Sequence, residues 1–198
     1  MTFFSRATFA DVERLLNREH YIGSQCADPS YVFVEREPGG LFGNCGEVVA
    51  AAVFAPPASF AWGKAIELIR LVREPRYTAP LSGFLSRCAH ELRLLRKWEI
   101  IVAYADPEVG HHGGVYQARS WIFVGYSSPK VVYVASNGRT MSQRSYDQRS
   151  RKVPLGSDWM KRKTGRKLTY VFPLNRIGMR RIGPRRKPYL KPREAAAS

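Results

Sequence analysis

Two stretches of the chain carry apolar side chains at steps of three and four residues, the spacing of one face of a helix. The first covers residues 9–18 and follows Thr8, which with Asp11 resembles the capping box that opens many helices. The second covers residues 80–96 and begins with Pro80, a residue that suits the first turn of a helix. We therefore predict a helix over each stretch.

The remaining apolar stretches are short and predict strands. They cover residues 31–36, 46–54, 65–72, 100–105, 131–135 and 168–172. The stretch 100–105 is apolar at every position, which is typical of a strand with both faces covered. A short helix is expected over 115–122. The order of these elements predicts an α/β fold in which helices cover both faces of one mixed central sheet.

The composition fits a folded chain in a reducing compartment. The chain has 198 residues, 44% of them hydrophobic, which suits one domain of ordinary size and excludes a wholly disordered chain. Its three cysteines, Cys26, Cys45 and Cys88, are too few and too scattered for a disulfide framework. No apolar run reaches the ~18 residues of a membrane span, and the first residues show no secretory signal. We therefore expect no membrane partner.

The positive charge is concentrated in the last third of the chain. The formal net charge is +16, and residues 139–198 alone hold 18 basic and 3 acidic residues. Such an end favours a polyanionic partner, of which nucleic acid is the first candidate; an anionic membrane surface and a merely solubilising tail are the alternatives. From about Arg176 basic residues alternate with Gly and Pro, so we expect a domain over 1–175 and a basic C-terminal tail over 176–198.

The central strand–helix–strand unit offers a place for a phosphate group. The first amides of its helix, around Ser82, Gly83 and Phe84, point to an anion site, and Ser86 lies one turn further in. An ordinary crossover helix shows the same pattern and is the alternative interpretation. The sequence has neither the G-x-x-x-x-G-K-[ST] motif of P-loop proteins nor the G-x-G-x-x-G motif of dinucleotide folds.

Polar residues interrupt or follow the apolar strands of this unit. Asp106 comes directly after the strand 100–105, where open α/β sheets bind ligands, and Arg70 interrupts the strand 65–72. The two side chains either share a ligand crevice or simply pair with each other. Tyr116 is a candidate acid if it faces that crevice, although most such tyrosines are structural. The sequence contains no H-E-x-x-H or C-x-x-C metal motif.

Several pieces of the sequence, in this order and spacing, resemble the Mom family of bacteriophage DNA adenine-modification proteins. They are HYIGS (20–24), ELIRLV (67–72), APLSGFLS (79–86), YADPEVGHHGGVYQARSWIFVG (104–125) and the basic end. The resemblance covers roughly residues 18–175. Its most specific part is the block from Asp106 to Gly125. The Mom family in turn resembles the GNAT superfamily of acyltransferases.

The resemblance implies a GNAT-like fold and a cofactor, acetyl-CoA or a related acyl-CoA. The pyrophosphate of such a cofactor lies on the helix that begins near Pro80. The matching cofactor-binding residues are Arg70, Ser82, Gly83, Phe84 and Ser86. The usual GNAT phosphate loop is richer in Gly and begins with Arg or Gln, whereas residues 78–83 of this chain are TAPLSG.

The resemblance also implies an activity. The family converts adenine in double-stranded DNA to an N6-carbamoylmethyl derivative, which protects phage DNA from host restriction, so we expect the protein in the cytoplasm of the bacterial host cell. Functionally important positions of the family match His20, Tyr21, Arg70, Asp106 and Tyr116. Asp106 is expected to act near adenine N6 as a base or metal ligand, and Tyr116 to orient the base or donate a proton.

Iron is a second cofactor that the resemblance implies. In acetyl transfer the acceptor nitrogen bonds to a carbonyl carbon, whereas in the carbamoylmethyl product it bonds to a CH₂ carbon. The amine of adenine is also a poor nucleophile, because its lone pair is delocalised into the ring. A redox-capable metal would account for this bond, and His20, Tyr21 and Asp106 would supply nitrogen and oxygen ligands to it.

The expected partner is double-stranded DNA. The target adenine must leave the duplex at a cost of a few kcal/mol, and contacts from the basic residues to phosphates are expected to offset that cost with little sequence preference. The expected DNA-binding residues are Arg139, Arg144, Arg149, Arg151, Lys152, Lys161, Arg162, Lys163, Arg166, Lys167, Arg180, Arg181, Arg185, Arg186 and Lys187.

Two other classes of function remain open. One is a GNAT-type N-acetyltransferase that acts on RNA or on a protein, and the other is a non-catalytic nucleic-acid-binding protein. Both accept the basic end, but only the Mom-like activity uses His20, Tyr21, Asp106 and Tyr116 together. The sequence also leaves the oligomeric state open, with a homodimer as one alternative.

Overall fold

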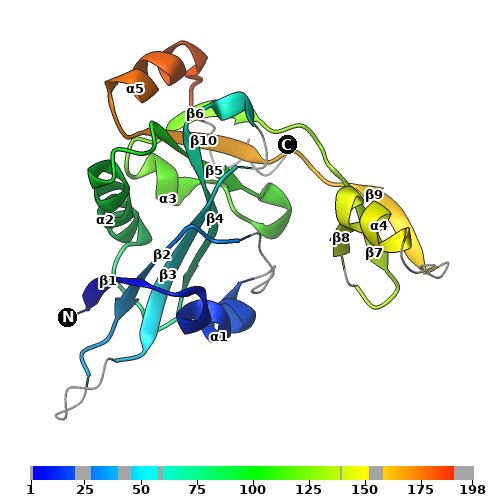
Figure 1. The fold of residues 1–198 in the computed structure, drawn as a ribbon, viewed down its shortest axis with the longest axis horizontal. Coiled ribbons are helices and arrows are strands. Elements are labelled where there is room, and N and C mark those ends of the chain that lie inside the picture. Colours follow the sequence, from blue (N-terminus) through cyan, green and yellow to red (C-terminus); the bar gives the residue numbers. More distant parts are fainter. Residues whose placement is uncertain are drawn as a thin grey trace. The chain divides into compact units, whose positions relative to one another are not determined.

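The computed structural model describes residues 2–20, 28–39, 46–57, 60–138, 140–151 and 158–189. Figure 1 shows their arrangement. The helices are α1 (Phe9–Glu19), α2 (Leu81–Leu94), α3 (Gly114–Gln117), α4 (Gln143–Ser150) and α5 (Arg176–Ile182), with short 3₁₀ turns η1 (Phe60–Trp62), η2 (Pro107–Val109) and η3 (Gly183–Arg185). The strands are β1 (Phe3–Ala7), β2 (Tyr31–Arg36), β3 (Val48–Ala55), β4 (Ala65–Arg73), β5 (Ile100–Ala105), β6 (Ile122–Tyr126), β7 (Val131–Ala135), β8 (Thr140–Ser142), β9 (Trp159–Lys163) and β10 (Leu168–Pro173).

Seven strands form the central sheet in the order β1-β2-β3-β4-β5-β10-β6. Strands β1 to β4 pair antiparallel, whereas β4 and β5 pair parallel. A parallel pair needs a long crossover connection, and α2 supplies it. The expected mixed sheet is therefore confirmed.

Helices α1 and α2 cover opposite faces of this sheet (Figure 1). Val12, Leu15 and Leu16 of α1 pack into one apolar cluster with side chains of β2, β3 and β4. On the other face Phe33 and Phe54 lie edge to face at 5.8 Å, and Phe4 bridges from Phe33 to Phe84 of α2. Because side chains alternate along a strand, one apolar run such as Val32–Val34 serves both faces. Helices on both faces were expected, and the structure confirms them.

A buried carboxylate joins α2 to the sheet. Glu35 of β2 is fully buried and forms an ion pair with Arg87 of α2. The hydroxyl groups of Thr2 and Tyr77 donate to its other oxygen at 2.8 and 2.6 Å. Burial raises the pKa of the Tyr77 hydroxyl above its usual value, so this hydroxyl keeps its proton as a donor to Glu35 at neutral pH.

A second, smaller sheet has the order β8-β7-β9 and is antiparallel throughout. Tyr133 of β7 stacks on Tyr146 of α4 with ring centroids 3.6 Å apart, and Trp159 meets Tyr146 edge on. Residues 131–135 were expected to be a strand, which is confirmed. The prediction that this strand belongs to the central sheet is wrong, because residues 131–135 form the middle strand of the second sheet.

The chain divides into two compact units. The first comprises residues up to Tyr104 with Gly113–Val124 and Thr169–Tyr189, and the second comprises Ala105–His112 and Gly125–Leu168. The first unit holds the two large apolar clusters and helices α1 and α2. The second holds the small sheet and α4. The stretch 1–175, which we expected to be a single domain, is therefore divided between two compact units.

Residues 176–189 are a packed part of the first unit. Helix α5 buries Gly178 and Ile182, and Ile182 belongs to an apolar cluster with residues of β5, β6 and β10. A side chain at Gly178 would lie 2.1 Å from the carbonyl oxygen of Glu99, so the helix backbone lies directly on the start of β5. The expectation of an unpacked tail from Arg176 is therefore wrong as far as residue 189. In the described part of the chain, no helix is long and apolar enough to cross a membrane.

Candidate functional site

Strands β4 and β5 separate partway along their length. Their parallel pairing runs from Ala65 with Ile100 to Leu68 with Ala103, and both strands continue beyond the last pair. On its other side β4 has a bulge at the same level, because Val53 pairs with Arg70 and Phe54 with Leu68, so the ladder passes over Ile69. The separation therefore begins where the bulge turns the strand.

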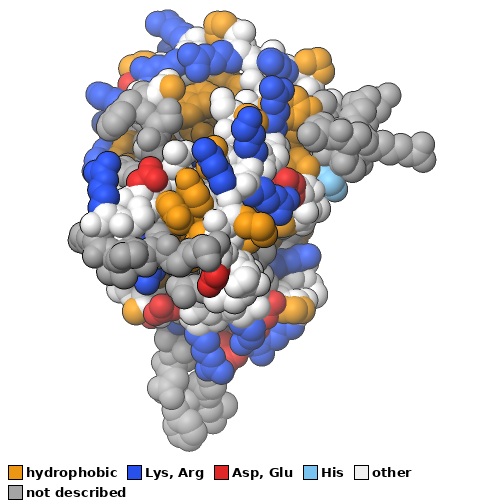
Figure 2. All heavy atoms as spheres, turned by 90° about the vertical axis from the view of Figure 1, so that its right-hand side faces the viewer, with side chains coloured by type: hydrophobic (Ala, Val, Ile, Leu, Met, Phe, Trp, Pro, Cys, Tyr) orange, Lys and Arg blue, Asp and Glu red, His pale blue; other side chains and the backbone are white. Residues whose placement is uncertain are grey.

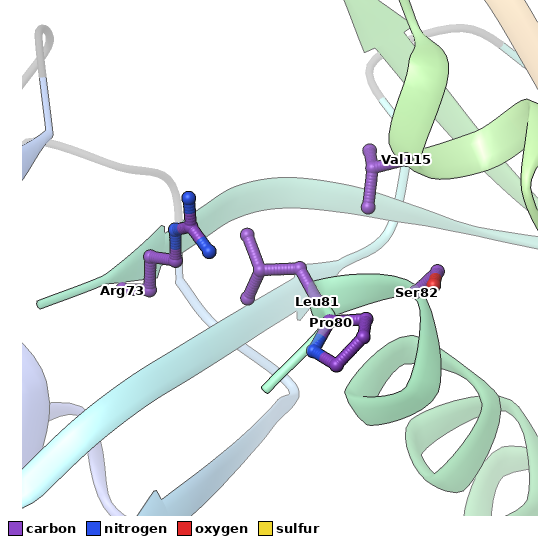
Figure 3. A pocket seen from close by; sticks show the side chains of 5 residues that line it. All are labelled: Arg73, Pro80, Leu81, Ser82 and Val115. Carbon is purple, nitrogen blue, oxygen red and sulfur yellow. The ribbon is translucent and has the colours of Figure 1, made fainter. Parts of the chain in front are cut away.

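A hollow of about 290 Å³ lies at the start of α2. It is lined by Arg73, Pro80, Leu81, Ser82 and Val115, and Figure 3 shows the guanidinium group of Arg73 directed toward Leu81. The start of a helix carries unpaired amides and a positive partial charge, and Arg73 adds a full positive charge. The hollow therefore suits an anionic group.

The expected phosphate-binding residues lie at or near this hollow. Ser82 lines it, and Ser86 donates its hydroxyl to the Ser82 carbonyl at 3.1 Å. The amides of Gly83 and Phe84 both donate to the Pro80 carbonyl, at 2.9 and 3.5 Å, and the side chain of Phe84 is fully buried. The amides left to bind an anion at the start of α2 are therefore those of Leu81 and Ser82, the first two residues of the expected phosphate site Leu81–Phe84.

Arg70 lies elsewhere. It is 9% exposed, and its guanidinium donates to the Ile69 carbonyl at 2.7 Å. It pairs with Val53 and stands two positions from Val72, and both valines pack in the cluster under α1. Its side chain therefore starts from the α1 face of the sheet. The residue that lines the hollow is Arg73, which the sequence analysis missed.

Tyr116 is 7% exposed and sits in an aromatic cluster. Its ring centroid is 5.0 Å from that of Trp121 and 5.2 Å from that of Tyr170. Gln117 in turn donates to the Tyr170 hydroxyl at 2.8 Å. This packing fixes the position of the Tyr116 ring, while its expected role as an acid stays a prediction.

Asp106 begins a short loop of the second unit. Its carboxylate accepts from the amide of Glu108 at 3.1 Å and forms an ion pair with Lys167, whose Nζ lies 2.8 Å from Oδ2. The residue is 9% exposed, so Lys167 supplies the counter-charge that a buried carboxylate needs. Lys167 was expected to bind DNA, but its ammonium group is directed to Asp106.

A second link joins this loop to the segment before β10. The Glu108 carboxylate accepts from the amide of Gly165 at 3.1 Å and lies 3.8 Å from the Arg162 guanidinium. The loop that carries Asp106 is therefore connected at two points to the segment that follows β9.

The predicted iron ligands receive no support. His20 ends α1, with its amide donating to the Leu16 carbonyl at 3.0 Å, and Tyr21 lies outside the described residues. Asp106 belongs to the second unit, where its carboxylate forms an ion pair with Lys167. Among the described residues no group of three or more His, Cys, Asp or Glu side chains is placed to hold a metal ion. The convergence of His20, Tyr21 and Asp106 stays a prediction.

The expected DNA-binding residues fall into three groups: those with structural partners, those outside the described residues, and the others, which are exposed. Arg181 pairs with Glu99 at 2.8 Å and donates to the Trp62 carbonyl, and Arg185 lies over the Trp62 ring at 5.4 Å, so both have structural partners. Arg139 and Lys152 lie outside the described residues, as does the side chain of Arg144. The remaining described members are all exposed, as Arg181 and Arg185 also are: Arg149, Arg151, Lys161, Arg162, Lys163, Arg166, Arg180, Arg186 and Lys187.

Comparisons with known proteins identify a family and a fold. The model of the Mom protein family matches residues 3–191. No curated protein sequence gives a significant match.

Solved acetyltransferases share the fold. A putative acetyltransferase from Salmonella typhimurium, solved with its cofactor acetyl-CoA, has a TM-score of 0.51 at 14% identity over 88% of this chain and 95% of its own. An N-acetyltransferase from Staphylococcus aureus Mu50 has a TM-score of 0.50 at 14% identity over 88% and 99% of the two chains. A putative acetyltransferase from Acinetobacter baylyi has a TM-score of 0.50 at 11% identity over 87% and 93%. The expected GNAT-like fold is confirmed.

Proposed function

Because the chain belongs to the Mom protein family, we propose that it is a transferase that modifies adenine in double-stranded DNA at N6. The product expected from the family is the N6-carbamoylmethyl derivative, which protects phage DNA from host restriction. Family membership over residues 3–191 is the observation that carries this proposal. The GNAT-like fold and the charge of the chain are consistent with it.

The hollow at the start of α2 fits the anionic part of an acyl-CoA. Arg73 and the amides of Leu81 and Ser82 would hold the phosphates, since they combine a positive charge with unpaired donors. When bound, such a cofactor would supply a two-carbon acyl group as its thioester. Simple transfer of that group gives an N-acetyl product, so the N–CH₂ bond of the carbamoylmethyl product requires an oxidant and an amide nitrogen in addition, and no bond-forming step is assigned to the residues of this hollow. The Salmonella relative by fold carries acetyl-CoA, which supports this assignment.

Asp106 and Tyr116 are the residues proposed to handle the base. The Asp106 carboxyl group, held by Lys167, would accept the proton that the adenine N6 amine gives up when it is substituted. Tyr116, fixed among Trp121 and Tyr170, would orient the extruded ring. The duplex must release the base first, at a cost of a few kcal/mol that phosphate contacts offset.

Mass spectrometry of nucleosides tests the proposal. Plasmid DNA is isolated from cells that express the full chain or its Asp106→Asn variant, and is digested to nucleosides. We expect a deoxyadenosine adduct with the mass of the carbamoylmethyl group with the parent chain, and none with the variant. An acetyl adduct would correct the transferred group. Unmodified nucleosides together with acetylated tRNA or protein would replace the proposal with an ordinary N-acetyltransferase.

A further inference from the structure

The second unit holds a large excess of positive charge. Residues 125–168 contain 11 basic and 2 acidic residues. Figure 2 shows one face of the molecule, on which Lys and Arg side chains predominate over Asp and Glu, with apolar side chains between them. The largest exposed apolar side chain of β9, Met160, is 69% exposed. The second unit is therefore basic and also exposes an apolar side chain. A polyanion that carries apolar groups as well as charges suits such a surface.

Strand β9 is an edge strand of the small sheet, and four of its five residues are exposed. Lys161 and Lys163 are opposite Tyr133 and Val131 of β7, on the face where Tyr133 stacks on Tyr146 of α4. Met160 and Arg162 point to the other face, because side chains alternate along a strand. Strand β9 therefore carries cations on both faces of the small sheet. On the face of Lys161 and Lys163, the Tyr133–Tyr146 stack holds α4 against the sheet.

The spacing of these cations fits a nucleic-acid backbone. Residues two apart on a strand rise by about 6.7 Å, and each DNA strand carries one phosphate per ~3.4 Å of helix axis, so Lys161 and Lys163 can each meet a different phosphate. Two other cations of this segment have carboxylate partners inside the unit: Lys167 pairs with Asp106, and Arg162 lies 3.8 Å from Glu108. Lys161, Lys163 and Arg166 are exposed and are the cations best placed to meet an external anion.

We propose that the small sheet with α4 is a docking surface for double-stranded DNA and that the β9 edge lies along one phosphate backbone. This inference rests on the proposed function, which makes duplex DNA the substrate. The same unit carries the Asp106 loop, which Glu108 and Lys167 connect to the segment after β9. Docking therefore holds the Asp106 loop close to the bound duplex, and its phosphate contacts are independent of base sequence.

The test measures binding of the full chain to a duplex DNA of about 30 base pairs at a series of salt concentrations. The Lys161→Gln/Lys163→Gln variant is compared with Lys64→Gln/Arg14→Gln, which removes the same charge from exposed positions of the first unit. Each phosphate contact contributes about 0.9 to the slope of log affinity against log salt. We expect the first variant to bind more weakly and to lower the slope by about 1.8, and the control to leave the slope unchanged.

Three outcomes would overturn the inference. One is an equal change of slope in both variants, which would mean that only net charge matters. Another is unchanged DNA affinity with new oligomers on gel filtration, which would show that the lysines guard the strand edge against pairing. The third is a clear preference of the parent chain for duplex RNA of equal length over the DNA.

The result is separable from the test of the proposed function. A chain that modifies deoxyadenosine but keeps its full salt slope in Lys161→Gln/Lys163→Gln retains the proposed function and loses this docking surface. A chain that loses the slope as expected but yields unmodified nucleosides retains the docking surface and loses the proposed function.

Discussion

Gly113 lies three residues before Tyr116 and has no room for a side chain, because its backbone lies against the ring of Tyr170. Its φ is +77°, and a Cβ placed there would lie 2.2 Å from the ring of Tyr170. Gly110 has the same φ, +77°, but a Cβ there would meet nothing within 4 Å. The two glycines therefore separate the cost of a left-handed backbone from the cost of a steric clash.

We expect Gly113→Ala to lower the free energy of unfolding by about 3 kcal/mol or more, because backbone strain and the clash with Tyr170 add together. Gly110→Ala carries only the strain, about 1–2 kcal/mol. Urea denaturation of the two variants measures the difference. Equal losses would mean that the Tyr170 ring moves aside freely.

Lys167 and Asp106 give the second prediction for single residues. Lys167→Met removes the counter-charge from a buried carboxylate, a loss of about 1–3 kcal/mol at the site. We expect roughly ten- to a hundredfold slower DNA modification with little change in DNA affinity. Lys167→Arg should retain most of the activity. A fall in affinity without a fall in the rate would instead make Lys167 a phosphate contact.

Sequence patterns predicted where the candidate residues lie along the chain better than they predicted the surroundings of those residues. Asp106 was selected because it follows a buried strand, and its place at the end of β5 is confirmed. Arg70 was selected as the strand-end cation, but the bulge at Ile69 and the length of β4 put Arg73 at the hollow instead. A bulge depends on pairing with a neighbouring strand, so local periodicity does not reveal it. Arg73 could have been selected as the first residue after the predicted strand 65–72.

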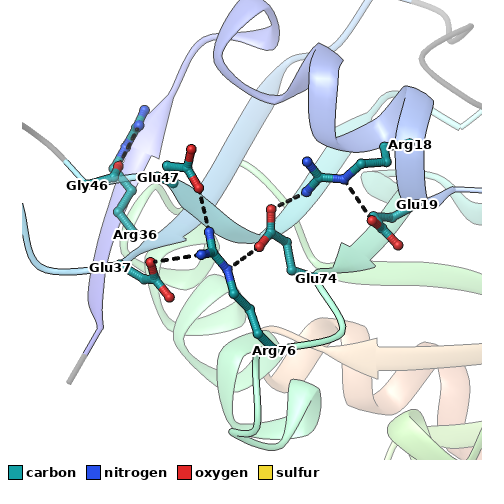
Figure 4. Close-up of polar contacts among 8 residues, drawn as sticks. All are labelled: Arg18, Glu19, Arg36, Glu37, Gly46, Glu47, Glu74 and Arg76. Atoms are coloured by element: carbon teal, nitrogen blue, oxygen red, sulfur yellow. Dashed lines mark hydrogen bonds and ion pairs between the residues drawn. The ribbon is translucent and has the colours of Figure 1, made fainter.

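An ionic network connects α1 to the end of β4 (Figure 4). Glu74, just after β4, pairs with Arg18 of α1 and with Arg76, and Arg76 also pairs with Glu47 and Glu37. Burial alone would raise the pKa of Glu74, but the hydrogen bonds from Arg18 and Arg76 outweigh burial and lower it below 4.5. Glu74 is therefore charged in the folded protein at pH values where it takes up a proton in the unfolded chain.

This network predicts a specific acid sensitivity. Because the folded pKa of Glu74 is lowered, its contribution to stability is complete above about pH 4.5 and is lost as the pH falls through the folded value. We expect Glu74→Gln to be less stable at pH 7 and to lose less stability on acidification. Asp158→Asn, which removes an exposed carboxyl, serves as the control. Thermal unfolding between pH 3 and 7 measures both; parallel curves for Glu74→Gln and the parent chain would contradict the prediction.

Elements with a continuous apolar stripe were predicted, and elements without one were missed. Helices α1 and α2 and strands β2 to β5 and β10 follow their expected positions within a few residues. Strand β1 is an edge strand with mostly exposed side chains, and β9 has charged residues at three of five positions, so neither shows an apolar pattern. Helix α5 is seven residues long and rich in Arg, and only Gly178 and Ile182 reveal that it is packed.

The two units differ in how deeply they bury their strands. Seven of the eight residues of β3 are buried, whereas one of five in β7 and none in β9 is buried. Stability within a protein follows such differences, because strands with little buried apolar surface open without global unfolding. The small sheet should therefore be the less stable part of the described chain.

Hydrogen exchange tests this prediction. We expect amides of β7 and β9 to exchange at least about tenfold faster than amides of β3 in the free protein. Addition of duplex DNA should slow exchange in β9 and leave β3 unchanged, because the proposed contact lies on β9. Equal protection of the two sheets in the free protein would contradict the first expectation, and protection by DNA confined to β3 would contradict the second.

The early end of the β4–β5 ladder has a chemical consequence. Beyond Leu68 and Ala103 the facing edges of two strands retain amide and carbonyl groups that no strand pairing of the described chain uses. Any extended molecule with amides of its own could continue the ladder there, as an added strand would. The arm of the proposed acyl-CoA contains two amide bonds, which main-chain groups of these edges would be able to bind. Side-chain substitutions along this gap should then be tolerated as long as the two edges stay apart.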